Sequence, residues 1–108
     1  MSTASETPVL DTIAAMTVDS LERCGLAPDM LLLTRIAALA ASDAPPISYA
    51  AHIDPALQAG LTAAQLEDVL VAIAPIVGTA RVMTAAGNIA TALGIAIAVA
   101  EAEIETRG

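Results

Sequence analysis

The chain has 108 residues and a formal net charge of −8 at pH 7, and 56% of its residues are hydrophobic. This length fits one domain, which we expect to span residues 1–108. The acidity argues against a nucleic-acid-binding protein, because such a protein needs basic surface to neutralise phosphates. The apolar content exceeds what a small monomer can bury, so the composition favours self-association, with membrane insertion as the alternative.

The first half of the chain predicts two helices. Thr7 followed by Pro8 is typical of a helix start and Gly25 of a helix stop, so we expect an N-terminal helix over about residues 8–24. A second helix, over about residues 28–41, begins at a proline. It is apolar on nearly all sides, which indicates a buried helix.

The segment S-D-A-P-P at residues 42–46 predicts a break, because residues before proline avoid the helical conformation. A third helix is expected from about Pro46. Asp54-Pro55 is predicted to interrupt it, with a short continuation that ends at Gly60.

A fourth helix is predicted to begin after Thr62. Thr62 and Gln65 fit a capping box, in which each side chain accepts a hydrogen bond from the other residue's backbone N–H. Pro75 is expected to kink this helix and Gly78 to end it. Its apolar residues recur at the spacing of a core-facing stripe: Leu66, Val69, Leu70, Ile73 and Ile76.

The last predicted helix runs from about Thr79 to Glu105. Its apolar stripe comprises Val82, Ala86, Ile89, Leu93 and Ala100, and its small-residue seam comprises Gly87, Ala90, Gly94 and Ala98. The nineteen residues 82–100 carry no charge, which is long enough for a membrane span, but no lysines or flanking aromatics anchor them. Residues 95–99 alternate like a strand, yet alanine disfavours strands, so we expect helix. The prediction is an all-α, single-domain bundle of five or six helices.

The rare residues gather in residues 42–52, which contain the only histidine and the only tyrosine. Ser48 and His52 are four residues apart, which places them on one helix face. A serine beside a histidine suggests nucleophilic catalysis, but such a base needs a third group to orient it. Alternatively, Ser48 is a first-turn helix residue and His52 a hydrogen-bonded interface histidine. His52 alone can serve as a general base near neutral pH, and Tyr49 is a candidate for packing or for substrate contact.

Arg35 and Arg81 lie in strongly apolar sequence contexts, where a charge needs a partner. Each is a candidate to hold a substrate carboxylate. The alternative is a salt bridge between helices or subunits, with Asp43, Glu67 or Asp68 as the acid.

No metal or cofactor is expected. One histidine and the single cysteine, Cys24, cannot assemble a convincing metal site, and one cysteine excludes a disulfide within the chain. The N-terminus has no pattern of a secretory signal, so we expect a cytoplasmic protein.

The order of these features resembles the carboxymuconolactone decarboxylase family, which includes the alkylhydroperoxidase D-like proteins. The resemblance is carried by LLLTRIAALAA at residues 31–41 and SYAAHIDPALQAGLTAAQLEDVLVAIAPIVG at residues 48–78. It covers about residues 28–95, the expected core of the domain. The resemblance implies an all-α fold that assembles as trimers or hexamers, with sites near the subunit boundaries.

The peroxidase branch of that family carries C-x-x-C-x-x-x-H and a glutamate in the preceding helix. On that motif His52 keeps the histidine, while Pro45 and Ser48 stand at the cysteine positions. The glutamate would fall at Leu33 or Ile36, and neither is acidic. Without two thiols there is no disulfide exchange at this site, so no thiol peroxidase activity is expected.

Three hypotheses remain. In the first, the protein acts on a small carboxylate in a lyase or decarboxylase reaction, with His52 as the base and an arginine holding the carboxylate. In the second, it is a non-catalytic oligomeric scaffold or interaction protein that kept the fold. The third, a membrane protein, is the weakest.

Overall fold

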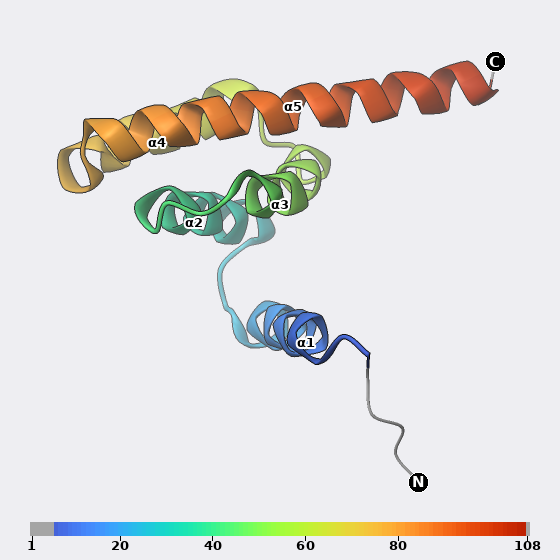
Figure 1. Cartoon of the computed structure of the whole chain (residues 1–108), viewed down its shortest axis with the longest axis horizontal. Coiled ribbons are helices and arrows are strands. Elements are labelled where there is room, and N and C mark those ends of the chain that lie inside the picture. Colours follow the sequence, from blue (N-terminus) through green and yellow to red (C-terminus); the bar gives the residue numbers. More distant parts are fainter. Residues whose placement is uncertain (1–5, 108) are drawn as a thin grey trace, which may run out of the picture.

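The computed structural model describes residues 6–107, except for the side chains at 96, 99, 100 and 103–107. The described residues form five helices and no strand, as the all-α prediction required (Figure 1). The helices are α1 (Pro8–Arg23), α2 (Pro28–Ala41), α3 (Pro46–Gln58), α4 (Ala63–Val77) and α5 (Thr79–Arg107).

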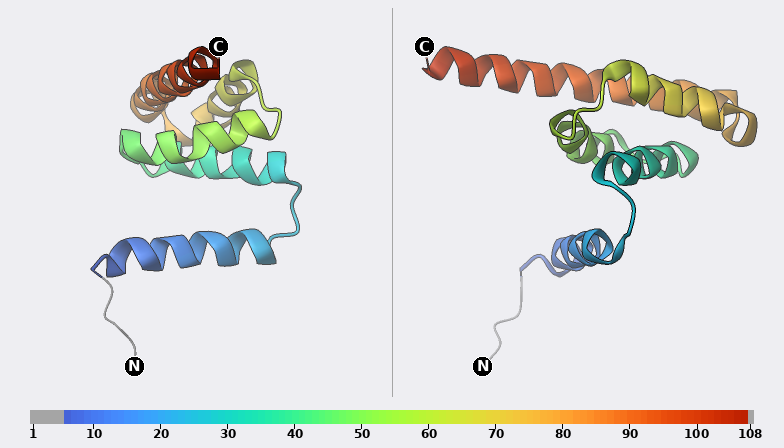
Figure 2. Two further views of the ribbon diagram at one scale, coloured as in Figure 1. Left: turned by 90° about the vertical axis from the view of Figure 1, so that its right-hand side faces the viewer. Right: turned by 180° about the vertical axis from the view of Figure 1, so that it is seen from behind.

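Helices α2 to α5 form one packed body. The long α5 lies across α3 and also contacts α4 and α2, and α2 packs against α3 and α4 (Figure 2). The core between these helices is aliphatic apart from Tyr49, the largest of its fully buried side chains. It comprises Leu31, Leu32, Ile36, Ala40, Tyr49, Ile53, Ala56, Leu61, Leu66, Leu70, Ala85, Ile89 and Ala92.

Helix α1 stands apart from this body. Residues 24–27 connect it to α2, and none of its Cα atoms lies within 8 Å of a Cα atom in another helix (Figures 1 and 2). None of its residues is buried. Six large apolar side chains on it are at least half exposed: Val9, Leu10, Ile13, Met16, Val18 and Leu21.

Local sequence signals explain the helix boundaries. The capping box at the start of α4 is confirmed: Gln65 N donates to Thr62 Oγ1 over 3.1 Å, and Thr62 N donates to Gln65 Oε1 over 2.9 Å. Gly78 ends α4 with φ of 94°, a left-handed conformation that suits glycine. At α1 the proline start is confirmed, but the Thr7 side chain makes no capping bond to the backbone.

The predicted interruption at Asp54-Pro55 is wrong, because α3 continues through both residues to Gln58. Pro55 lies in the last turn, where it costs one backbone hydrogen bond, and its own carbonyl still accepts from Ala59 N over 3.0 Å. A proline so near a helix end can be accommodated without a break.

Two predicted stripes also need correction. Ile76 is 90% exposed, because the buried face of α4 ends at Leu70 with Ile73 partly buried. Among the described side chains of α5 the buried positions are Ala85, Ile89 and Ala92, so Ala86 lies one residue away from the buried face and is exposed. The predicted stripe residue Ala100 is outside the described side chains.

The small-residue seam of α5 is exposed along its whole length, at Gly87, Ala90, Gly94 and Ala98. No other helix of the same chain covers it. Residues 95–99 are helical, as expected. Within the described part of the chain, no helix is long and apolar enough to cross a membrane.

Candidate functional site

A cavity of about 420 Å³ lies where α1 faces α2 and α3. Arg35 comes from α2 and His52 from α3, so we call it the Arg35–His52 cavity. Its walls are mainly apolar side chains, including Ile13 and Leu21 of α1 and Leu31 and Leu32 of α2. A second cavity of about 300 Å³, the flanking cavity, shares Ile13, Thr17, Arg35 and His52 with it. The arginine and the histidine therefore border both spaces.

The backbone of α3 orients the His52 ring. Its Nδ1 lies 2.7 Å from the carbonyl oxygen of Ser48, one turn earlier. A carbonyl oxygen can only accept a hydrogen bond, so Nδ1 carries the proton and donates it. The neutral ring then has its lone pair on Nε2, the arrangement of a general base.

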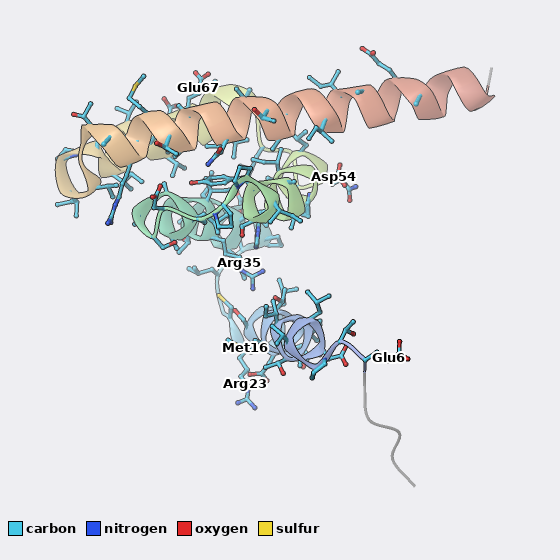
Figure 3. The ribbon with its side chains drawn as sticks, viewed as in Figure 1. Glu6, Met16, Arg23, Arg35, Asp54 and Glu67 are labelled. Carbon is cyan, nitrogen blue, oxygen red and sulfur yellow. The ribbon has the colours of Figure 1, made fainter. Side chains whose placement is uncertain are left out.

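Arg35 links α2 to α1. Its Nη2 donates to Ser20 Oγ over 3.1 Å and makes a longer contact of 3.5 Å to the carbonyl oxygen of Thr17. Figure 3 shows this side chain pointing from α2 toward α1. A guanidinium has five N–H donors, and the described contacts use only those on Nη2. Donors therefore remain for a ligand.

The electrostatics of the site oppose the net charge of the chain. Among the described residues, neither cavity is lined by an Asp or Glu, although the whole chain carries −8. Arg35 is always charged, and its positive potential is strengthened by the apolar walls around it. The site suits an anion.

The other residues of the third helix lie differently. Ser48 is half-buried and lines neither cavity, and it is its backbone carbonyl that accepts the hydrogen bond from His52. Tyr49 is buried in the core, away from both cavities. Burial, and to a lesser extent the charge of Asp43, raise the pKa of Tyr49 above its ordinary value of 10.0.

Arg81 has a different environment from Arg35. It is exposed on α5, and its Nη1 donates to the carbonyl oxygen of Ala41 at the end of α2 over 2.8 Å. A cation at this place satisfies a terminal carbonyl and the helix dipole. Among the described residues the ion pair is Arg23–Asp19, so the salt bridges predicted for Arg35 and Arg81 do not form within one chain.

Cys24 is a half-buried free thiol at the C-cap of α1, and it borders neither cavity that contains His52. In the part of the chain that the structure describes, no three His, Cys, Asp or Glu side chains are grouped to hold a metal ion.

Sequence reasoning missed the contribution of α1. Ile13, Thr17 and Leu21 form one wall of the Arg35–His52 cavity, and Ser20 holds Arg35. Ile13, Thr17 and Leu21 are spaced i, i+4 and i+8, so they share one helix face. That periodicity was the available signal.

Three comparisons with known proteins bear on this fold. The model of a family described as the carboxymuconolactone decarboxylase family matches residues 8–92. Comparisons with curated proteins and with solved structures gave no match. The matched region runs from the start of α1 through the buried half of α5, and it contains Arg35 and His52.

Proposed function

The chain belongs to the carboxymuconolactone decarboxylase family, and on that basis we propose that it binds a small carboxylate at Arg35 and uses His52 as a general base in a lyase or decarboxylase reaction. The observation that carries this proposal is that both side chains border the same cavity, with His52 Nδ1 bonded to the Ser48 carbonyl. The family match supports the class of chemistry, and the cavity supports the residue roles.

The chemistry assigned to each residue is simple. Arg35 anchors a carboxylate that stays on the substrate. For a lyase step, His52 Nε2 takes a proton from a carbon next to a carbonyl, and the freed electron pair forms a double bond as the leaving group departs with its own pair. For a decarboxylation, the electron pair comes from the bond to the departing CO₂. His52 then acts as a general acid: Nε2, protonated from solvent, gives its proton to that carbon.

The test is proton exchange in heavy water. We expect the protein to exchange the proton next to the carbonyl of carboxylate-bearing lactones, followed by NMR. His52→Gln should abolish exchange, while Arg35→Gln should raise KM more than it lowers kcat, because Arg35 anchors a remote group. Gln58→Ala, on the same helix but outside both cavities, is the matched control. Equal activity of His52→Gln and the original chain would refute the catalytic role.

The second candidate is a non-catalytic scaffold. It is favoured by one observation: no acid in the described part of the chain lines either cavity, so these residues give a protonated His52 no carboxylate partner to relay its proton. If His52→Gln changes no reaction rate but Arg35→Gln weakens carboxylate binding, the non-catalytic scaffold is supported over the enzyme.

Thiol peroxidase chemistry is not part of the proposal. Pro45 and Ser48 occupy the positions of the two thiols, and Cys24 borders neither cavity of His52. Serine cannot replace cysteine, since its alkoxide is far less accessible than a thiolate. Peroxide reduction that is abolished by alkylating Cys24 would overturn this.

We further propose that the protein assembles as a trimer or hexamer, which family membership and the exposed apolar surface both support. The large side chains exposed on α4 and α5 are Val71, Ile76, Met83, Ile95 and Ile97, and those of α1 add to them. The exposed small-residue seam of α5 would let another helix approach closely. Cytoplasmic location remains a prediction from the sequence.

A further inference from the structure

The Arg35–His52 cavity has one permanent charge among apolar walls. Its lining side chains with polar atoms are Thr17, Arg35 and His52. The Thr17 hydroxyl already donates to the carbonyl of Ile13 within α1 over 2.9 Å. A ligand therefore meets one cation, one imidazole and otherwise hydrocarbon.

We propose that the ligand of this cavity is a monocarboxylate with an apolar body. This inference rests on the proposed function, because it names the substrate class of the same site. The carboxylate pairs with the free guanidinium donors of Arg35, and the body lies among Leu26, Leu31 and Leu32 on one side and the α1 wall on the other. His52 Nε2 then faces the carbons near the carboxylate end.

The walls disfavour a second charge. A charged group among apolar side chains is destabilised unless it is paired, and no second cation is among the described residues that line this cavity. Because the α1 wall is half exposed to solvent, the penalty is only part of that for a fully buried charge. Arg81, the other arginine that the sequence suggests as a partner for a substrate carboxylate, instead donates to the Ala41 carbonyl at the end of α2. A dicarboxylate is therefore a poor ligand.

This restriction also selects between the two reactions. A decarboxylation that keeps the Arg35-bound carboxylate requires a second carboxylate to lose, and the cavity disfavours one. Proton transfer to Nε2 and elimination require only one carboxylate, together with an uncharged carbonyl and leaving group in the body, such as the lactone ring of the proposed function. The substrate class thus favours the lyase reaction.

The cavity is large enough for such a body. Its volume of about 420 Å³ falls in the range of small-molecule sites, about 300–1,000 Å³. Each methylene removed from water contributes about 0.8 kcal/mol, so affinity should rise about fourfold for each carbon added to the chain until the cavity is filled.

The experiment is calorimetric titration of the full chain with acetate, butanoate, hexanoate and octanoate. Two ligands matched to octanoate in length, octanol and octanedioate, test the charge requirement. We expect the stepwise rise with chain length, and both matched ligands should bind about tenfold or more weakly than octanoate. Affinity independent of chain length, or tighter binding of octanedioate, would overturn the proposal.

Two alanines of α3 supply matched variants. Both are exposed, but Ala51 lines the cavity and Ala50 does not. Ala51→Phe should fill the cavity and weaken octanoate binding about fifteenfold, the value of about two buried methylenes, while Ala50→Phe should leave it unchanged. Equal effects would place the ligand elsewhere and overturn the assignment. Far-UV circular dichroism checks that both variants fold.

Failure of this inference is distinguishable from failure of the proposed function. If the protein binds no octanoate but His52 catalyses proton exchange on lactones that carry two charges, the monocarboxylate ligand class is refuted and the role of His52 as general base stands. If octanoate binding depends on Arg35 but no reaction depends on His52, the ligand class is supported and the proposed catalytic function is refuted.

Discussion

Replacing Thr62 with alanine tests whether the capping box holds the start of α4. The hydroxyl accepts the Gln65 N–H over 3.1 Å, so Thr62→Ala leaves that donor to water. The Thr62 N–H keeps its own bond to Gln65 Oε1, so half of the box survives. Loss of an N-cap oxygen typically costs about 1 kcal/mol, which corresponds to a fall in Tm of about 4–8 °C for a domain of this size.

The matched control is Thr84→Ala. The Thr84 hydroxyl donates to the Ala80 carbonyl inside α5 over 3.1 Å and caps nothing. Alanine is the better helix former there, so Thr84→Ala should be neutral or raise stability by a few tenths of a kcal/mol. Both are measured by thermal unfolding in far-UV circular dichroism at one protein concentration, because the proposed self-association would make Tm depend on concentration. If both variants changed Tm equally, the capping argument would be refuted.

Three further predictions concern the core and the surface. The raised pKa of Tyr49 means that, as pH rises, the unfolded chain loses the phenol proton before the folded chain does. The free energy of unfolding, measured by urea titration, should therefore decline as pH rises past about 10. Tyr49→Phe should flatten that decline. Leu66→Ala should cost about 2–5 kcal/mol in urea unfolding, because Leu66 is fully buried between α4 and its neighbours, and a cost below 1 kcal/mol would contradict tight packing there. If the proposed oligomer uses the exposed Ile76, Ile76→Asp should reduce the mass measured by light scattering without changing the circular dichroism. An unchanged mass would exclude Ile76 from the proposed interface.

Much of the fold could be predicted because its signals are local. Prolines at the starts of α1, α2 and α3, the capping box of α4 and Gly78 at its end each act through the backbone within one turn. The same reasoning failed at Pro55. A proline in a helix removes one backbone hydrogen bond, but the sequence does not say whether the helix continues despite that loss. It failed at Ile76 because helical spacing gives the direction of a side chain but not where the neighbouring helix ends.

The candidate site depends on arrangements that no local signal encodes. His52 was predictable as a candidate base from its residue type, but its Nδ1 bond to the Ser48 carbonyl replaces the serine–histidine pair that the spacing suggested. Arg35 and Arg81 look equivalent in the sequence, since both are lone cations in apolar surroundings. What separates them is the partner each one meets: Arg35 reaches Ser20 of α1 beside a cavity, and Arg81 reaches the last turn of α2. The position of α1 therefore decides which arginine borders a cavity. The i, i+4 and i+8 spacing indicates which face of α1 lines the cavity, but the place of α1 depends on a four-residue connection and on the contacts of Arg35 with Thr17 and Ser20.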